Sequence, residues 1–359
     1  MKKVMLIGVD DNLIGGVASV IRTFKLNLSE LNIIHIKTSS DGSLPKILIA
    51  LKSYISFLYK MIFYNFDIFH VHCSAYGSFY RKIPFFLVFH LLKREYIFHC
   101  HSGGFPEFYE KDSFAKFIFD SYVIPRSILV FVSYNSQQSL LDKIDSKYYR
   151  QIKTTVMPNY SLPVCKEYNK KNVTGSSRMY FGFFGDVTDL KGFEDAVNFT
   201  KSLREYGFNA HLKVAGRKPD NNYFDKVLES YDASDFVIYE GLIDPEYKGQ
   251  FFSDIIFLLS FSKVESFGMS NLESCLFGVP VIAYDIGGVS MVIKHGVNGF
   301  LSSLGDSEQN IATIRQILDD NKAYISITTS CFDYTKSKFS EHHFKAEVHK
   351  LYNFGRIAL

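Results

Sequence analysis

The chain has 359 residues, of which 47% are hydrophobic, so it can bury large cores and is neither disordered nor fibrous. A single core stops growing at about 250–300 residues, which favours two domains. The net charge of +3 and the pI near 8.4 are too mild for a nucleic-acid-binding protein, although they fit weak attraction to an anionic membrane surface. The five cysteines show neither paired nor metal-ligand spacing, as is typical of reduced cytosolic thiols.

The beginning of the chain shows no targeting segment. Met1-Lys2-Lys3 leads directly into an apolar strand pattern, without the cleavage site of a signal peptide. The longest apolar run, at 83–92, is much shorter than the roughly 20 residues that a membrane-spanning helix needs. We therefore expect a soluble, cytoplasmic protein.

Strand and helix patterns alternate through the first half of the chain. Short, continuous apolar runs predict buried parallel strands at 4–7, 33–36, 67–72, 96–101, 128–132 and 155–157. Apolar residues at helical spacing predict helices at 17–28, 44–64 and 85–92. Together these elements predict a Rossmann-like sheet.

Two of the predicted helices combine apolar with basic residues. The basic residues of these helices and their ends are Lys46, Lys52, Lys60, Lys93 and Arg94. Such a combination suits the surface of a membrane. For the lysines of 44–64 a solvated face is the preferred interpretation, and for 85–92 it is burial against the sheet; contact with a membrane surface is the alternative for both.

Polar residues follow two strands of this half at the edge where open α/β sheets bind ligands. Gly15 and Gly16 stand at the first strand-to-helix turn, where a backbone can approach a phosphate closely, although a plain tight turn explains them equally well. His101 ends the strand 96–101 and can donate to a sugar or phosphate oxygen. We prefer it to His99, which strand alternation is expected to direct elsewhere. A histidine that only caps its loop remains the alternative.

The second half repeats the alternation of strand and helix. Strands are predicted at 180–184, 211–215, 236–239, 255–259, 281–284 and 296–301, and helices at 193–206, 246–252, 269–277, 289–294 and 341–354. The polar run 166–178 predicts a linker. The predicted domains are therefore 1–163 and 164–340, with a last helix, about 341–359, able to pack back on the first domain.

The segment ESFGMSNLESCLFGVP, at 265–280, holds two glutamates in one strand–loop–helix–strand unit. Glu265 lies in the loop and Glu273 on the helix. The backbone N–H groups after Phe267, from Gly268 and Met269 onward, open that helix and point at an anion.

Two cations, Lys191 and Arg217, lie in loops after neighbouring predicted strands. Cations that converge on a helix start form a diphosphate site. The two glutamates could instead be the acid and the nucleophile of a glycoside hydrolase, and that alternative stays open.

Taken together, these residues resemble the family-4 retaining glycosyltransferases of the two-Rossmann GT-B type, including bacterial polysaccharide-assembly members. From about 180 to 301 the resemblance is carried by F-F-G-D-x4-K-G, V-A-G, E-x7-E, G-V-P-V-I-A, G-G and G-V-N-G-F-L. The first half matches more loosely, through G-G-V, H-V-H, H-C-H-S-G-G-F and M-P-N.

The resemblance implies an α/β fold of two Rossmann-like domains that face each other across a crevice. It also implies transfer of a hexosyl unit, with retention, from a UDP- or GDP-sugar to a glycan or lipid-linked acceptor in cell-surface polysaccharide biosynthesis. Glu273 would hold the ribose hydroxyls and Glu265 a hydroxyl of the donor sugar. Lys191 and the N–H groups after Phe267 would hold the diphosphate.

In the first half, the resemblance places His101 beside the donor sugar and Gly16 against the diphosphate. Two positions depart from the family pattern. Asp186 stands where the family usually has a phosphate-binding arginine, and we expect Arg217 to substitute for it. Met291 replaces a usual glutamate.

No Asp-x-Asp motif stands at a strand end, so basic groups are expected to replace a metal ion, and no cofactor is expected besides the donor. Two further alternatives stay open. One is a non-catalytic sugar-nucleotide-binding subunit of an assembly complex, and the other is a GT-B epimerase, which the E-x7-E string disfavours.

Overall fold

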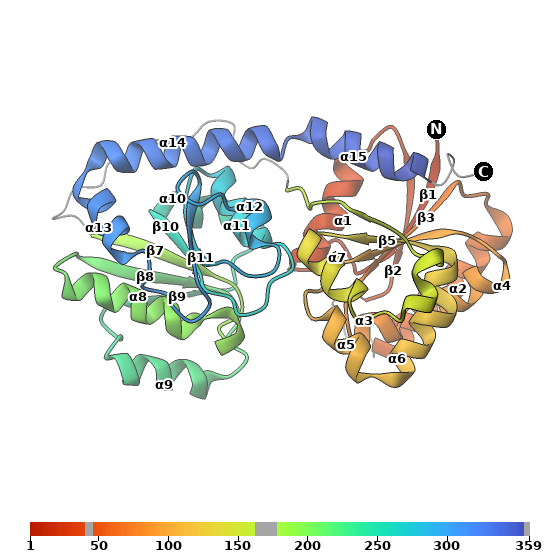
Figure 1. The fold of residues 1–359 in the computed structure, drawn as a ribbon, viewed down its shortest axis with the longest axis horizontal. Coiled ribbons are helices and arrows are strands. Elements are labelled where there is room, and N and C mark those ends of the chain that lie inside the picture. Colours follow the sequence, from red (N-terminus) through yellow and green to blue (C-terminus); the bar gives the residue numbers. More distant parts are fainter. Residues whose placement is uncertain (40–45, 162–177, 355–359) are drawn as a thin grey trace. The chain divides into compact units, whose positions relative to one another are not determined.

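Parallel strands form the centre of each of the two units into which the chain divides (Figure 1). The structure is a computed structural model, and it describes residues 1–39, 46–161 and 178–354. The N-terminal unit comprises Met1–Tyr160 and Glu341–Leu359, and the C-terminal unit comprises Ser161–Ser340. The predicted boundary at 163/164 and almost all of the predicted linker fall outside the described residues.

The sheet of the N-terminal unit has the strand order β2-β1-β3-β4-β5-β6, with every pair parallel. All residues of β4 and β5 are buried, as expected for strands covered by helices on both faces. The strands are β1 (Lys3–Gly8), β2 (Asn32–Lys37), β3 (Ile68–Cys73), β4 (Tyr96–Cys100), β5 (Ser127–Phe131) and β6 (Lys153–Val156).

Helices cover this sheet, and the last of them comes from the end of the chain. Phe344 of α15 meets Phe24 of α1 edge-on, with ring centroids 5.1 Å apart, so the end of the chain completes the N-terminal core. The helices are α1 (Gly16–Asn27), α2 (Lys46–Phe63), α3 (Gly77–Tyr80), α4 (Ile83–Leu91), α5 (Phe105–Lys111), α6 (Ser113–Ile118), α7 (Tyr134–Leu141) and α15 (Glu341–Phe354). Shorter helical turns lie at Phe119–Val123, Ile124–Arg126 and Ser146–Gln151.

The sheet of the C-terminal unit has the order β12-β11-β10-β7-β8-β9, again with parallel neighbours. Its strands are β7 (Met179–Phe184), β8 (Ala210–Ala215), β9 (Val237–Gly241), β10 (Phe257–Ser260), β11 (Val281–Tyr284) and β12 (Gly299–Ser302). Its helices are α8 (Phe193–Glu205), α9 (Asn221–Tyr231), α10 (Lys248–Asp254), α11 (Met269–Leu276), α12 (Val289–Val292), α13 (Ile311–Asp319) and α14 (Asn321–Lys338).

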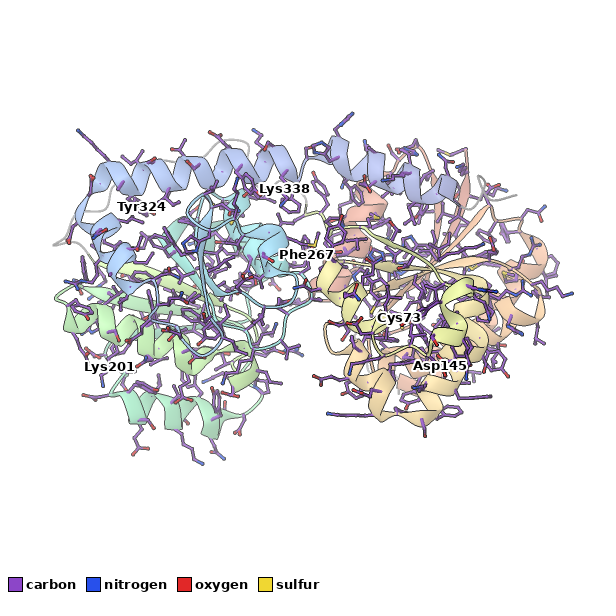
Figure 2. All side chains as sticks on the ribbon, viewed as in Figure 1. Cys73, Asp145, Lys201, Phe267, Tyr324 and Lys338 are labelled. Carbon is purple, nitrogen blue, oxygen red and sulfur yellow. The ribbon has the colours of Figure 1, made fainter. Side chains whose placement is uncertain are left out.

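Helix α14 is the longest element that the sequence patterns did not predict. Its buried stripe follows helical spacing but consists largely of small or hydroxylated side chains: Tyr324, Ile327, Thr328, Cys331 and Thr335. Tyr324 packs into the core, where its hydroxyl donates to the Ile256 carbonyl at 3.3 Å (Figure 2). A stripe of this composition gives little apolar periodicity, so the sequence does not predict this helix.

In each sheet the first strand is internal, and the chain adds later strands on both of its sides. β1 lies between β2 and β3, and β7 lies between β8 and β10. Loops that leave the carboxyl ends of strands on either side of such a reversal diverge and leave room for a ligand. The loops after β1, β7 and β10 carry Gly15, Lys191 and Glu265, respectively.

The two helices that combine apolar and basic residues differ in burial. Phe85, Phe86 and Phe89 of α4 are buried, as the sequence predicted. Most of the apolar stripe of α2 is exposed, and of Lys46 only the backbone is described. In the described part of the chain, no helix is both long enough and apolar enough to cross a membrane.

Candidate functional site

The loops at the carboxyl ends of the C-terminal strands are joined to one another by backbone hydrogen bonds. The loop after β10 donates from Lys263 N–H to the Leu190 carbonyl in the loop after β7, at 2.8 Å. The loop after β7 donates in turn from Val187 N–H to the Arg217 carbonyl after β8, also at 2.8 Å. These bonds hold the predicted site loops in one frame.

The loop after β11 joins the same frame through a glycine. A Cβ atom on Gly287 would lie only 1.9 Å from the carbonyl oxygen of Glu265, and Gly287 has a φ of +52°. No other residue type fits such a close approach in this left-handed conformation. Gly287 therefore fixes where the backbone of Glu265 lies.

Lys191 and Glu265, both predicted from the sequence, meet across the reversal of strand order. The Lys191 ammonium lies 2.9 Å from Oε2 of Glu265. Lys191 ends a short helical turn, Asp189–Lys191, which begins where the Thr188 hydroxyl accepts from Lys191 N–H. The side chains are 38% and 17% exposed, so solvent and ligands can reach this pair.

Helix α11 begins beside Glu265 without a capping side chain. Its N-cap is Gly268, and Met269 is its first residue. Phe267 is buried and packs edge-on against Phe339, so only its backbone is available to a ligand. The first turn therefore presents backbone N–H groups and the positive end of the helix dipole.

Asn271 lies in the same first turn and was missed by the sequence analysis. Its side chain is completely buried, and neither Oδ1 nor Nδ2 has a hydrogen-bond partner in the described structure. Nδ2 lies beside the helix start, 2.7 Å from where a Cβ on Gly268 would be. A buried amide without partners costs free energy unless a ligand supplies them, so Asn271 adds a polar group for a ligand at this helix start.

Glu273, on the same helix, is held by a lysine that the sequence did not single out. The Lys248 ammonium of α10 lies 2.9 Å from Oε1 and 2.7 Å from Oε2 of Glu273. The Glu273 side chain is 7% exposed and that of Lys248 is 19% exposed. Each carboxylate oxygen has a second lone pair, so Glu273 can still accept from a ligand hydroxyl.

Arg217 forms an ion pair with Asp186, the residue that stands where a phosphate-binding arginine was expected. Its Nε and NH2 groups donate to the two carboxylate oxygens of Asp186 at 3.0 and 2.8 Å. This ion pair is more exposed than the Lys191–Glu265 and Lys248–Glu273 pairs, because 65% of the Arg217 side chain is accessible to solvent. Asp186 therefore neutralises Arg217, a contact that separate inspection of the two loops could not reveal.

In the N-terminal unit, His101 belongs to a group of four buried histidines at the ends of β3 and β4. His72 Nδ1 lies 2.8 Å from His101 Nε2, and His70 Nε2 lies 3.1 Å from His99 Nδ1. His70 Nδ1 contacts the Tyr352 hydroxyl at 3.0 Å. Two H-x-H motifs on predicted neighbouring strands were the signal that could have revealed this cluster.

The expectation that His99 is directed away from His101 is wrong. Their ring centroids lie 4.2 Å apart, because residues i and i+2 of a strand share one face. Burial lowers the pKa of His101 to about 3, and the Lys82 ammonium acts in the same direction. His101 is therefore uncharged at neutral pH and acts only as a neutral hydrogen-bonding group.

Three of these histidines offer nitrogen ligands to a metal ion. Nitrogen atoms of His70, His72 and His99 all lie within 4.8 Å of one another. Their rings are stacked, with 14° between His70 and His72 and 19° between His70 and His99. The nitrogens of His70 already face His99 and Tyr352, so a metal would have to displace these hydrogen bonds.

Gly15 and Gly16 form the start of α1, as predicted. Gly15 is the N-cap with a φ of +148°, which side chains rarely adopt, and a Cβ there would meet nothing within 4 Å. The helix has no capping side chain. This turn is therefore open in front and could receive an anion.

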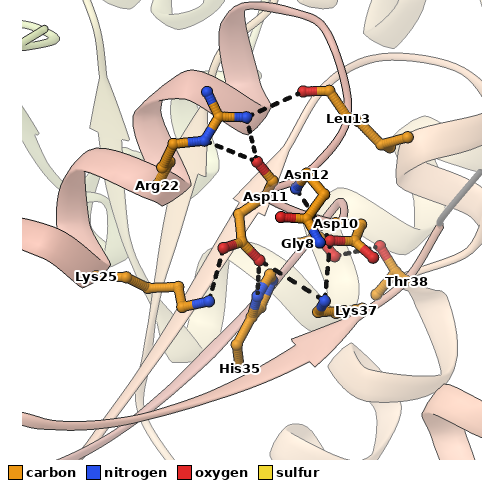
Figure 3. A network of polar contacts seen from close by, with 10 residues as sticks. All are labelled: Gly8, Asp10, Asp11, Asn12, Leu13, Arg22, Lys25, His35, Lys37 and Thr38. Atoms are coloured by element: carbon orange, nitrogen blue, oxygen red, sulfur yellow. Dashed lines mark hydrogen bonds and ion pairs between the residues drawn. The ribbon is translucent and has the colours of Figure 1, made fainter. Parts of the chain in front are cut away.

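The loop that leads to Gly15 is fixed by Asp11 (Figure 3). Its carboxylate pairs with Lys25 at 2.6 Å and with His35 at 3.2 Å, and its carbonyl accepts from Arg22 Nε at 3.0 Å. Burial raises the pKa of Asp11, but the hydrogen bond from Lys25 and further contacts outweigh it, so the pKa lies below its usual value. Asp11 serves as an ionised brace of the loop.

Comparison with known proteins finds a family model that matches part of the chain. Residues 165–329 match the model of the family described as glycosyl transferases group 1. The 2-deoxystreptamine glucosyltransferase of Streptomyces kanamyceticus is 24% identical over 162 residues, which cover 45% of this chain and 42% of that protein. The match to this relative thus spans less than half of its length.

Two proteins are similar over most of the chain. An uncharacterized 41.2 kDa protein in the cps region of Klebsiella pneumoniae is 24% identical, with 81% of this chain and 80% of that protein covered. The Anabaena protein HepE, solved with UDP and glucose, superposes with a TM-score of 0.74 at 15% identity, covering 98% and 99% of the two chains. This structural likeness confirms the predicted GT-B fold class, with two Rossmann-like units of six parallel strands.

Proposed function

We propose that this protein is a family-4 retaining glycosyltransferase that moves a hexosyl unit from a UDP- or GDP-sugar to a glycan or lipid-linked oligosaccharide acceptor. The observation that carries the proposal is the Lys191–Glu265 pair, 2.9 Å apart, beside the uncapped start of α11. The match of residues 165–329 to glycosyl transferases group 1 supports the same class of reaction.

The charges of the pair suit the two ends of a sugar–phosphate bond. When that bond breaks, negative charge grows on the leaving diphosphate and positive charge on the anomeric carbon. Lys191, the first N–H groups of α11 and the Asn271 amide are donors for the diphosphate, and Glu265 accepts from a hydroxyl of the sugar. A bound donor thus replaces the ion pair with two new interactions.

The remaining predicted residues take supporting roles in the proposal. Glu273 accepts from the ribose hydroxyls, while Lys248 balances its charge. His101 and the Gly15–Gly16 turn contribute from the N-terminal unit to the same reaction. The acceptor hydroxyl attacks from the side of the leaving group, and its proton passes to the departing phosphate oxygen.

A hydrolase that uses Glu265 and Glu273 as acid and nucleophile is less consistent with the geometry. Such an enzyme needs one carboxyl group free to protonate the glycosidic oxygen and another free to attack the sugar. Each glutamate instead has a lysine ammonium within 2.9 Å of a carboxylate oxygen. The pairs suit binding of a charged nucleotide donor better than cleavage of a neutral glycoside.

The biological setting belongs to the same proposal. We place the reaction in the assembly of a cell-surface polysaccharide such as a capsule, an O-antigen of lipopolysaccharide or an exopolysaccharide, in the cytoplasm and in peripheral contact with the inner membrane. The similarity to a protein of the Klebsiella pneumoniae cps region supports this setting. We expect no metal requirement, because cationic groups face the diphosphate.

A thermal-shift screen of nucleotide sugars, followed by turnover with lipid-linked acceptors, tests the proposal. A donor at about 100 times its Kd stabilises the protein by roughly 2.7 kcal/mol, or about 5 °C. Product analysis with and without acceptor separates transfer from hydrolysis, and chelation by EDTA should leave turnover unchanged. If no UDP- or GDP-sugar shifted the melting temperature, the proposal would be wrong.

A further inference from the structure

The outer face of α2 in the N-terminal unit carries a continuous row of exposed apolar side chains. Their positions recur every three or four residues, so they share one face of the helix. The row, with the exposed fraction of each residue, is Ile47 (78%), Leu48 (47%), Leu51 (55%), Ile55 (59%), Tyr59 (54%), Ile62 (74%) and Phe63 (65%). Single exposed apolar residues are ordinary on proteins, but a row of seven marks an interaction surface.

The opposite face of α2 fixes this orientation. Phe57 is completely buried, and its ring lies 4.8 Å from Phe85 and 5.5 Å from Phe89 of α4, measured between centroids. Because these contacts hold the inner face against the core, the helix cannot turn its outer row inward. The row is therefore a permanent feature of the folded unit.

The neighbouring helix extends the surface at its carboxyl end. Leu91 and Leu92 are 76% and 54% exposed, and Lys93 and Arg94 follow them directly. Both helices precede parallel strands, and their ring contacts show that they pack side by side in the same direction (Figure 1). We call the seven α2 residues together with Leu91 and Leu92 the apolar face.

The two segments that carry the apolar face contain only positive charges. The segments 46–66 and 83–94 contain no Asp or Glu, whereas Lys52 and Lys60 lie on α2 and Lys93 and Arg94 follow α4. The acids that directly follow these two segments are Asp67, which accepts from Lys3 N–H at 2.8 Å, and Glu95, which pairs with Lys153 at 2.7 Å. The apolar face therefore lies in a surplus of positive charge.

We propose that the apolar face docks on a bilayer that contains anionic lipids, with α2 lying in the plane of the interface. Apolar side chains on such a helix reach about 5–10 Å into the boundary of the acyl chains, and each nearby lysine or arginine adds roughly 1 kcal/mol of attraction to anionic headgroups. A second copy of this chain fits less well, because a two-fold interface would bring the same cations together. The proposal does not depend on the donor site of the C-terminal unit, but it would place a lipid-linked acceptor within reach of the enzyme.

Flotation of the full-length protein with vesicles tests the proposal. Vesicles of pure phosphatidylcholine are compared with vesicles in which phosphatidylglycerol replaces part of it. We expect flotation with the anionic vesicles, weakened as salt rises, and little with the neutral ones. An Ile55→Ser/Ile62→Ser variant should lower the partition coefficient about tenfold or more, because it removes two exposed apolar side chains.

Matched variants separate this role from general surface effects. Leu242 and Leu304 of the C-terminal unit are 53% and 57% exposed, and Leu242→Ser/Leu304→Ser should leave flotation unchanged. Lys52→Glu/Lys60→Glu should abolish the preference for anionic vesicles. UDP affinity should stay the same in all variants, which checks folding and keeps this result separate from the proposed reaction.

Two outcomes would overturn the proposal. One is wild-type protein that does not float with anionic vesicles, or that floats as well after Ile55→Ser/Ile62→Ser as before. The other is a dimer in light scattering that the same variant dissociates, without binding to vesicles. The second result would assign the apolar face to a second copy of the chain.

Discussion

The polar groups near the predicted site residues differ in charge and burial between the two units. In the C-terminal unit, Lys191–Glu265 and Lys248–Glu273 are ion pairs in or beside loops, with side chains 7–38% exposed. In the N-terminal unit, β3 and β4 instead carry buried imidazoles whose pKa values burial lowers, to about 3 for His70 and His101. Ion pairs can exchange partners with a charged ligand, whereas neutral imidazoles avoid the cost of buried charge.

The largest effect is expected where an ion pair faces the reaction. Lys191→Ala should lower kcat by about 100- to 1000-fold, because one donor to the developing charge on the leaving group is lost. The measurement is steady-state turnover of the donor once it is identified. Lys263→Ala, which removes the neighbouring pair with Asp189, serves as the control. If the kcat of the Lys191→Ala variant stayed within threefold of the wild-type value, Lys191 would not stabilise the leaving group.

The second prediction concerns donor affinity. Glu273→Ala should weaken UDP or GDP binding by roughly 10- to 100-fold, because a hydrogen bond to a charged group contributes about 1.5–3 kcal/mol. Calorimetric titration of the nucleotide measures this change. Lys248→Met keeps Glu273 and removes only its partner, so a smaller loss is expected. Equal losses in both variants would mean that the intact pair, rather than Glu273 itself, holds the nucleotide.

The third prediction tests the neutral imidazoles. Below about pH 6.5 the unfolded chain takes up a proton on His70 and on His101, whereas burial in the folded unit lowers the pKa of each to about 3, so stability falls as the pH drops through this window. Each such histidine should lower the free energy of unfolding by roughly 1 kcal/mol for each unit that the pH drops. His101→Gln should therefore flatten the decrease in unfolding free energy between pH 6.5 and pH 5, measured by chemical denaturation.

An exposed histidine provides the control for this measurement. His349 is 47% exposed where it contacts Glu30, so His349→Gln controls for the exchange of a histidine for glutamine outside the buried cluster. A wild-type unfolding free energy that stays constant from pH 7 to pH 5 would show that the imidazoles take up protons in the folded state. The contrast between the two units would then be wrong.

The smallest effect is expected from the most exposed pair. Asp186→Asn removes the charge that neutralises Arg217 and should tighten donor binding only a few-fold, because exposed pairs contribute less than about 1 kcal/mol. Arg217→Ala should weaken donor binding by a similar factor. Donor affinity that stays the same in both variants would show that Arg217 does not act as a phosphate-binding arginine in place of position 186.

The alternation of short apolar runs and helices predicted both sheets, because buried parallel strands leave a strong signal in sequence. The E-x7-E segment and Lys191 likewise led to residues that lie together in the structure. Partners from distant elements were not predictable, since nothing in the sequence near Lys248 or Asp186 indicates which side chain each meets. Asn271 was not predicted either, because the sequence does not show that its amide is buried without a hydrogen-bond partner in the described structure.

One interpretation failed at the level of faces rather than elements, and one face was left unassigned. The position of His99 was misjudged although strand periodicity alone places it with His101. The stripe of α2 was recognised as helical, but periodicity cannot tell which stripe faces the core when a helix carries apolar residues on most sides. Phe57 lies opposite the row from Ile47 to Phe63, and its packing against α4 shows that its own side of the helix faces the core.

Helix α15 makes the N-terminal unit dependent on residues that follow the whole C-terminal unit in sequence. Phe24 and His70 receive Phe344 and Tyr352 as neighbours, yet more than 250 residues separate them in sequence. During translation, the first unit therefore obtains this helix only after the C-terminal unit has been synthesised. A protein expressed without residues 341–359 should therefore lose stability in its N-terminal half, while 161–340 folds as before.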